Sequence, residues 1–202
     1  MSAYLCDASF LSDANKYQRH IKSITHIKSI NTTKPTLLNV IHLLIPLKIL
    51  LNNNVYWLQV VSSGGNLLLN IPPTFDGLIM PVFQHLLSEM GMYLDRNGEA
   101  IYGSITWTTQ NDTASPNVWY TRNKTETTTV YACITDHWPG TTLELAAPKP
   151  ISGFSTTVVL FGYPGFLKWQ MLSNGNMSIV MPVLFPDTKL KHGWVLKLTT
   201  VK

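Results

Sequence analysis

The chain has 202 residues, of which 45% are hydrophobic and 13% are charged. Average globular proteins carry about 25% charged residues, and this sequence shows neither a glycine period nor heptads, so its composition excludes disordered, collagen-like and coiled-coil classes. The formal net charge of +4 lies in residues 1–58, which hold six basic and two acidic residues, whereas residues 59–202 are balanced. Because binding to nucleic acid requires clustered positive charge, the composition predicts no nucleic-acid partner.

Residues 1–58 mix Ser, Thr, Asn, Lys and Ile without a steady period. Their apolar stretch, Leu37 to Leu51, is interrupted by Pro46 and Lys48 and is shorter than the roughly 20 apolar residues that span a bilayer, so we predict no membrane association. The first residues contain Asp7 and lack the apolar core of a signal peptide. We expect 1–58 to be an unrelated segment, irregular or loosely helical, with few contacts to the rest and no strand for pairing.

Residues 59–102 have the pattern of one strand followed by one helix. The run Leu67 to Ile71 lies between Gly64-Gly65 and Pro72-Pro73, which is typical of a strand buried on both faces in a parallel sheet. Pro81 suits the first turn of a helix, which we expect over Pro81 to Asp95. The apolar residues that recur at three- and four-residue steps are Val82, Phe83, Leu86, Leu87, Met90 and Leu94. A lone parallel strand needs a partner from elsewhere.

Residues 103–202 contain short apolar runs separated by turn residues, which predicts an antiparallel β-sandwich. The expected strands are Ser104–Thr109, Val118–Thr121, Thr129–Thr135, Thr142–Leu145, Thr156–Phe161, Phe166–Met171, Met177–Met181 and Trp194–Val201. Five of the six tryptophans fall in this part and provide bulk for a two-sheet core. The fold class predicted for the whole chain is therefore mainly β.

No catalytic signature is evident in the residues. Glycoside hydrolysis uses two carboxylates, and nucleophilic hydrolysis places Ser or Cys near a His, but the acidic residues and histidines here follow neither pattern. Asp136 and His137 are adjacent, so on a strand they point to opposite faces. Cys6 and Cys133 lack metal-site spacing. The sequence predicts no metal site and no cofactor.

Four glycosylation sequons occur, a number close to the chance expectation for this composition. They start at Asn31, Asn111, Asn123 and Asn176. We treat Asn111, Asn123 and Asn176 as candidate sites of N-glycosylation, because they lie in the part with a regular strand pattern.

Several separate motifs, in order, closely resemble the end of the catalytic domain and the C-terminal domain of alpha-L-fucosidases of the animal lysosomal and secreted type. The motifs are Val60-Val61-Ser62-Ser63-Gly64-Gly65-Asn66-Leu67-Leu68-Leu69-Asn70-Ile71, Pro73-Thr74, Asp76-Gly77, Asn97-Gly98-Glu99-Ala100-Ile101-Tyr102, Gln110-Asn111-Asp112-Thr113, Val118-Trp119-Tyr120-Thr121, Val130-Tyr131-Ala132, Trp138-Pro139 and Gly193-Trp194 to Lys202. The resemblance covers about residues 59–202.

The resemblance implies the C-terminal portion of a glycosidase: the last strand and helix of a truncated (β/α)₈-type barrel over 59–102, then a C-terminal β-sandwich over 103–202. It implies a retaining hydrolase that releases terminal alpha-L-fucose from glycoproteins and glycolipids, with fucosylated glycans as partners, no cofactor, a lysosomal or secreted location, and homo-oligomers among full-length relatives. In this family the catalytic carboxylates lie upstream, so none is carried over and we expect the chain alone to be inactive. Glu99 is expected to be an anchor.

Three polar residues are candidates for the rim of a substrate pocket: Asn66, Asn70 and Asp76. They lie at or after the expected carboxyl end of the strand, the side on which barrel enzymes build active sites. Pro72 stands where the family usually has glycine, so this loop departs from the family pattern. The alternative is a stand-alone carbohydrate-binding or structural sandwich, for which exposed tryptophans would be evidence of sugar binding.

Overall fold

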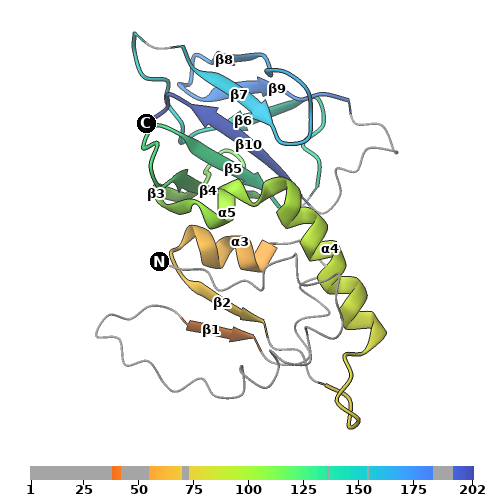
Figure 1. Ribbon diagram of the computed structural model, residues 1–202. Coiled ribbons are helices and arrows are strands. Elements are labelled where there is room, and N and C mark those ends of the chain that lie inside the picture. The colour runs from red at the N-terminus through yellow and green to blue at the C-terminus, as the bar shows by residue number, and fades with distance from the viewer. Residues whose placement is uncertain (1–37, 42–54, 70–72, 136, 154, 184–192) are drawn as a thin grey trace, which may run out of the picture.

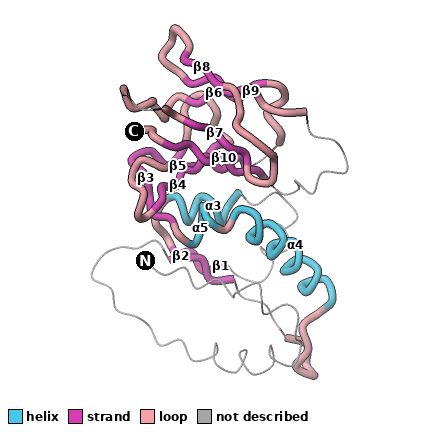
Figure 2. Tube along the Cα trace, turned by 45° about the horizontal axis from the view of Figure 1, so that its top comes forward, coloured by secondary structure: helices cyan, strands magenta, loops and turns pink. Residues whose placement is uncertain are grey.

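The computed structural model describes residues 38–41, 55–69, 73–135, 137–153, 155–183 and 193–202. From Ser104 onward these residues build two antiparallel sheets that face each other, and helices cover the outer face of the larger sheet (Figures 1 and 2). The described chain is thus mainly β, with a C-terminal β-sandwich, which confirms the predicted fold class. No helix in the described residues is long and apolar enough to cross a bilayer.

All eight strands predicted beyond residue 103 are present, with ends shifted by a few residues. The five-stranded sheet has the order β3-β4-β5-β10-β7, with β3 (Ser104–Asn111), β4 (Val118–Asn123), β5 (Val130–Ile134), β10 (Trp194–Thr199) and β7 (Thr157–Leu160). The three-stranded sheet has the order β6-β9-β8, with β6 (Thr142–Leu145), β9 (Met177–Val180) and β8 (Trp169–Met171). Each pair of neighbours in both sheets is antiparallel.

A first apolar core fills the space between the two sheets. It includes Tyr120, Leu145, Ile179 and Leu196, all fully buried. Strand β10 alternates between its two faces, because Leu196 and Leu198 enter this core while Val195 lies on the opposite face of the sheet.

A second core lies between the five-stranded sheet and the helices α3 (Val55–Ser62), α4 (Pro81–Asn97) and α5 (Glu99–Tyr102). Its buried members are Leu58, Met90, Tyr93, Leu94, Ala100, Ile101, Tyr131, Cys133 and Val195. Helix α4 begins at Pro81 as predicted and ends two residues later than expected. Because both faces of the sheet are covered, every residue of β5 is buried.

One expectation about the N-terminal segment is wrong. Residues 38–41 form strand β1 (Leu38–Ile41), which pairs in parallel with β2 (Asn66–Leu69), from Leu38 opposite Asn66 to Ile41 opposite Leu69. Parallel strands need a crossover connection, usually helical, and α3 lies in the chain between these two strands. Segment 1–58 therefore supplies the partner strand that we expected it to lack.

The expectation that residues 1–58 make few contacts with the sandwich is also wrong for the last residues of this segment. Helix α3 runs across position 58, and Leu58 is 1% exposed in the core that includes Tyr131 and Cys133 of β5. Residues 1–37 and 42–54 lie outside the described part, as does the end of the predicted strand at 70–72. The division into 1–58, 59–102 and 103–202 stays a prediction.

Candidate functional site

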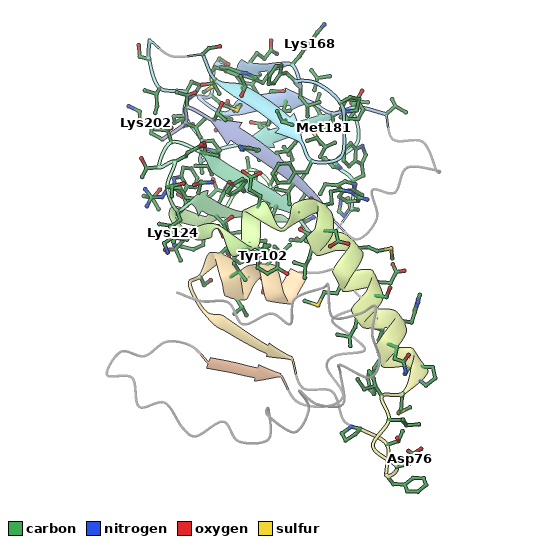
Figure 3. The ribbon with its side chains drawn as sticks, viewed as in Figure 1. Asp76, Tyr102, Lys124, Lys168, Met181 and Lys202 are labelled. Atoms are coloured by element: carbon green, nitrogen blue, oxygen red, sulfur yellow. The ribbon has the colours of Figure 1, made fainter. Side chains whose placement is uncertain are left out.

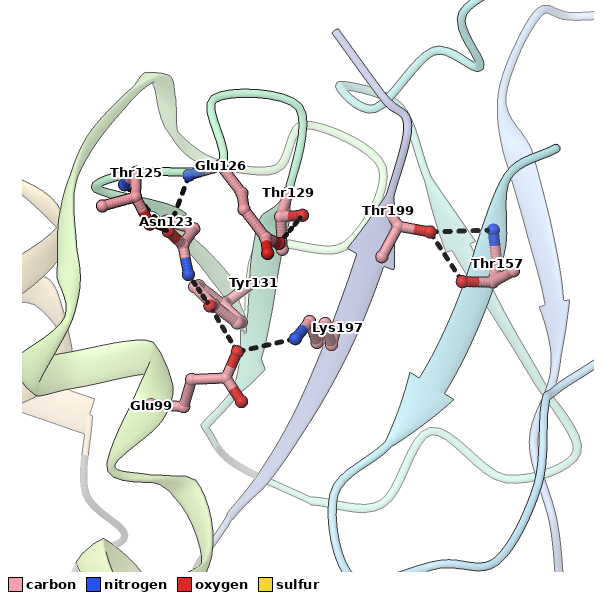
Figure 4. A network of polar contacts seen from close by, with 9 residues as sticks. All are labelled: Glu99, Asn123, Thr125, Glu126, Thr129, Tyr131, Thr157, Lys197 and Thr199. Carbon is pink, nitrogen blue, oxygen red and sulfur yellow. Dashed lines mark hydrogen bonds and ion pairs between the residues drawn. The ribbon is translucent and has the colours of Figure 1, made fainter. Parts of the chain in front are cut away.

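A chain of polar side chains joins the helical layer to the five-stranded sheet (Figure 4). Glu99 Oε1 of α5 accepts hydrogen bonds from Tyr131 Oη of β5 at 2.8 Å and from Lys197 Nζ of β10 at 2.7 Å. Asn123 Nδ2, at the end of β4, donates to Tyr131 Oη at 2.7 Å. The Glu99 carboxylate thus connects α5 directly with β5 and β10, and through the Tyr131 hydroxyl with β4, in agreement with the expected anchoring role.

The electrostatics of Glu99 are those of an anchor and not of a catalytic acid. Partial burial opposes ionisation, but the hydrogen bonds from Lys197 and Tyr131 and the lysine charge outweigh it and lower the pKa of Glu99. Burial raises the pKa of Tyr131, and the adjacent Glu99 carboxylate adds to this, so the hydroxyl stays protonated and can donate. A glycosidase acid needs a raised carboxyl pKa, whereas Glu99 has the opposite shift.

A second carboxylate, Asp112, is 1% exposed between the ends of the two sheets. Its two oxygens accept five hydrogen bonds, from Ala114 N (2.8 Å), Ser115 N (2.9 Å), Tyr120 Oη (2.6 Å), Ala146 N (2.9 Å) and Ala147 N (3.0 Å). Ser115 Oγ adds a bond of 2.7 Å to the carbonyl oxygen of Glu144. Asp112 therefore ties β4 and the turn after β3 to the segment that follows β6.

Sequence reasoning quoted Asp112 within a motif but gave it no role. An aspartate before a short turn is a signal for local bonds to the next backbone N–H groups, and Ala114 and Ser115 make these bonds. The bonds from Ala146 and Ala147 are long-range and have no local signal.

The structure describes two of the three candidate rim residues, Asn66 and Asp76. Asp76 is exposed at the tip of a projecting hairpin (Figure 3), where it accepts a hydrogen bond from Thr74 Oγ1. Asn66 is the first residue of β2, so the argument from the carboxyl end of the strand is wrong for this residue. Asn70 lies outside the described residues. A role at a pocket rim stays a prediction for these positions.

The amide groups of the three candidate glycosylation sites are all engaged. Asn111 Nδ2 donates to the carbonyl oxygens of Pro116 (2.7 Å) and Val118 (3.0 Å), and Asn176 Nδ2 donates to Glu144 Oε1 (2.7 Å). The bonds from Asn176 and Asn174 lower the pKa of Glu144. Glycosylation of Asn111, Asn123 and Asn176 stays a prediction, and Asn31 lies outside the described residues.

The sandwich tryptophans do not form an exposed platform for sugar rings. Trp107 is 7% exposed, and Trp138, Trp169 and Trp194 are partly buried against the sandwich core. Trp119 is half-buried on β4. Exposed tryptophans would be evidence of sugar binding, so this burial favours a structural role for the sandwich.

The described residues contain no cluster of His, Cys, Asp and Glu that suits a metal ion. Cys133 is a free thiol, fully buried in the core between helices and sheet, and burial raises its pKa to about 12. It is therefore protonated and shielded near neutral pH, unlike the exposed thiolates that act as nucleophiles.

Comparison with known proteins gives matches over two adjoining parts of the chain. A family model described as alpha-L-fucosidase matches residues 55–99, and one described as the alpha-L-fucosidase C-terminal domain matches residues 110–199. Among curated proteins, the chain is 45% identical to plasma alpha-L-fucosidase of Homo sapiens and 41% identical to the human tissue alpha-L-fucosidase, each over 145 residues, which is 71% of this chain and 30% of the relative.

Solved structures share the fold. An alpha-L-fucosidase GH29 from Bacteroides thetaiotaomicron has a TM-score of 0.59 at 20% identity, with 78% of this chain and 32% of that chain covered. The alpha-fucosidase of Thermotoga maritima has a TM-score of 0.59 at 22% identity, with 80% and 36% covered. The chain thus spans about a third of the length of these proteins.

Proposed function

Because the chain belongs to the alpha-L-fucosidase family and carries its C-terminal portion, we propose that it serves as part of a glycosidase that releases terminal alpha-L-fucose from glycoproteins and glycolipids. The observation that carries the proposal is the 45% identity over 145 residues to human plasma alpha-L-fucosidase, together with the two family models that match residues 55–99 and 110–199. Identity at this level, with both parts folded, supports a shared role for them.

In this proposal the sandwich braces the strand–helix unit of the catalytic domain. The core between the helices and the five-stranded sheet, together with the bonds of Glu99 to Tyr131 and Lys197, holds α4 and α5 in place. Helix α3, whose Leu58 lies in the same core, contacts β2, so the brace also helps to position this strand, at whose carboxyl end a barrel enzyme would place its site.

We propose further that the 202-residue chain has no fucosidase activity of its own. A retaining glycosidase needs two carboxyl groups about 5 Å apart, one of them with a raised pKa. Among the described residues, Asp112 is enclosed by five donors, and the hydrogen bonds to Glu99 and Glu144 lower the pKa of both. These three carboxylates therefore do not suit the task.

A chimera tests the proposed function. Residues 59–202 replace the matched C-terminal part of human plasma alpha-L-fucosidase, and release of 4-methylumbelliferone from its alpha-L-fucoside is measured. We expect the chimera to retain activity and the isolated 202-residue chain to show none. A folded chimera without activity would contradict the proposal, and turnover by the isolated chain would contradict its inactivity.

Location and assembly form a separate proposal. The relatives are named plasma and tissue fucosidases, and the chain has sequons at Asn111, Asn123 and Asn176, so we propose a secreted or lysosomal glycoprotein that acts as a homo-oligomer in its full-length form. A glycosidase-sensitive mass shift of the protein from animal cells, lost in the matching Asn→Gln variants, would support glycosylation, and an unchanged mass would count against it.

A further inference from the structure

The three-stranded sheet has one face that no other described element covers. Its inner face packs into the core between the two sheets, whereas both faces of the five-stranded sheet are covered, one by this core and the other by the helices (Figure 1). Side chains alternate along a strand, so the residues next to the core members of β6, β8 and β9 point outward. The outer face consists of Thr142, Glu144, Lys168, Gln170, Ser178 and Val180.

Part of this outer face is apolar and open to solvent. Val180 of β9 is 52% exposed and donates its backbone N–H to the carbonyl oxygen of Lys168 (2.8 Å), next to β8. Phe166 is 73% exposed and points to the same side as Lys168, because Leu167 between them enters the core. Figure 3 shows Lys168 at the end of the sandwich away from the helices. The outer face thus combines apolar groups with hydroxyl, amide and ammonium groups.

Asn176 lies just before β9 on the same face. It opens the sequon Asn176-Met177-Ser178. Met177 enters the core, so Asn176 and Ser178 point outward. Asn176 Nδ2 donates to Glu144 Oε1 of β6 (2.7 Å). Val180 is four residues further along the chain, about 13 Å in an extended strand, so the first few sugar rings of an N-glycan on Asn176 can reach it.

The hydrogen bonds of the three candidate sequons favour Asn176 for a sugar. An N-linked glycan replaces one of the two hydrogens on the amide nitrogen. Asn111 Nδ2 donates two bonds to backbone carbonyl oxygens and would lose one of them. Asn123 Nδ2 donates to the hydroxyl of the fully buried Tyr131, so a sugar there would crowd a closed network. Asn176 Nδ2 can keep its bond to Glu144, a side chain that is open to solvent, and still carry a sugar over the outer face.

We propose that an N-linked glycan on Asn176 lies along the outer face of the three-stranded sheet and covers Val180 and Phe166. The inference rests on the proposed glycoprotein, and it names the sequon and the surface that the sugar covers. The occupant is a carbohydrate because sugar rings carry both apolar C–H faces and hydroxyl groups. The C–H faces can pack on Val180 and Phe166, while the hydroxyls exchange hydrogen bonds with Thr142 and Gln170. The glycan then removes an exposed apolar patch from contact with water.

The test secretes the full 202-residue chain from animal cells behind a signal peptide and measures the glycan occupancy of each sequon by peptide mass spectrometry. Hydroxyl-radical footprinting then measures the oxidation of Phe166 and Val180. Phe75 in the projecting hairpin, which is 106% exposed, is the internal reference. We expect Asn176 to be occupied. Ser178→Ala removes the sequon and leaves Asn176 in place, so it should raise the oxidation of both side chains several-fold relative to the reference.

Three controls separate the glycan from the substitution. Ser178→Thr keeps the sequon and should give the wild-type oxidation pattern. Thr113→Ala removes the sequon at Asn111 and should leave the oxidation of Phe166 unchanged. Trimming the wild-type glycan to its first sugar with an endoglycosidase should raise this oxidation without any change of sequence. Circular dichroism checks that each variant is folded.

The outcomes distinguish the inference from the proposal on which it rests. An occupied Asn176, with oxidation of Phe166 and Val180 unchanged both in Ser178→Ala and after trimming, would overturn the inference and leave the glycoprotein intact. An unmodified Asn176 beside an occupied Asn111 or Asn123 would also overturn only the inference. A secreted chain without any glycan would contradict both.

Discussion

Replacing Asp112 by alanine should destabilise the sandwich more than any other single truncation of its polar side chains. The change removes the acceptor of four backbone N–H groups and the Tyr120 hydroxyl, at a site that is 1% exposed. An unsatisfied buried donor costs about 1–3 kcal/mol, and water entering the vacated space relieves part of it. Ala114 and Ser115 belong to the turn that follows Asp112, so we count only the three remaining donors, Tyr120, Ala146 and Ala147. Their unsatisfied hydrogen bonds give a loss of about 4 kcal/mol in the free energy of unfolding.

Urea unfolding followed by tryptophan fluorescence measures this loss. Trp107 is buried and its ring lies 5.0 Å from that of Tyr120, so its emission reports on the affected core. Tyr120→Phe removes a single donor to the carboxylate and should cost about 1.5–3 kcal/mol. Asp112→Asn keeps the volume but turns an amide NH₂ toward N–H donors, so its cost should fall between the other two variants.

The ranking of the three variants is the critical result. If Asp112→Ala stayed within about 0.5 kcal/mol of wild type, the range of ordinary surface changes, or cost less than Tyr120→Phe, the view of Asp112 as the tie between the sheets would fail. An unchanged denaturant slope would show that the variants alter stability and not the extent of unfolding.

Four further outcomes are expected. Glu99 has a lowered pKa in the folded state, so its contribution to stability is present above its unfolded-state pKa of about 4.3 and is lost as the pH falls through the folded-state pKa. Glu99→Gln should therefore flatten the pH dependence of the free energy of unfolding below about pH 5, and an unaltered profile would contradict this. Asn97 buries an amide whose two polar atoms lack partners, so Asn97→Leu should raise the free energy of unfolding by about 1 kcal/mol, and a loss would refute the reasoning. A Cβ on Gly98 would lie 2.6 Å from the Leu94 carbonyl oxygen, so Gly98→Ala should lower the melting temperature. In a Cys6→Ser background, Cys133 should resist a thiol reagent at pH 8 until urea unfolds the chain, and rapid native labelling would show an accessible thiol.

The strands of the sandwich could be predicted because turn residues separate them. Pairs such as Pro139-Gly140 and Asn174-Gly175 fall between consecutive strands, and Gly140 and Gly175 adopt positive φ angles of 82° and 79°. Helix α4 was equally predictable, since Pro81 and the three- and four-residue spacing agree. Local chemistry therefore determined most of the fold beyond residue 81.

Strand β1 could not be predicted for a physical reason. Leu38–Ile41 lies within an apolar run without alternation, which suits helix and strand alike, and a parallel partner is always distant in sequence. The candidate site likewise contains one residue that the sequence predicted and partners that it did not. Glu99 was predicted as an anchor from its motif, whereas its partners Tyr131 and Lys197, which lie 32 and 98 positions away, depend on the tertiary fold.

The five-stranded sheet has no solvent face at its centre, and this limits how the sandwich can be transferred between proteins. Many β-sandwiches are portable modules, because their outer faces are polar. Here the outer face carries Tyr131, Cys133 and Val195, each fully buried beneath Leu58, Tyr93 and Ile101 of the helical layer. A cut at residue 103 would expose this apolar surface to water. The sandwich and the three helices are therefore expected to be inherited and expressed as one unit. A fusion protein that joins another domain at residue 103 would expose an apolar surface that promotes aggregation, and would not gain an independently folded domain.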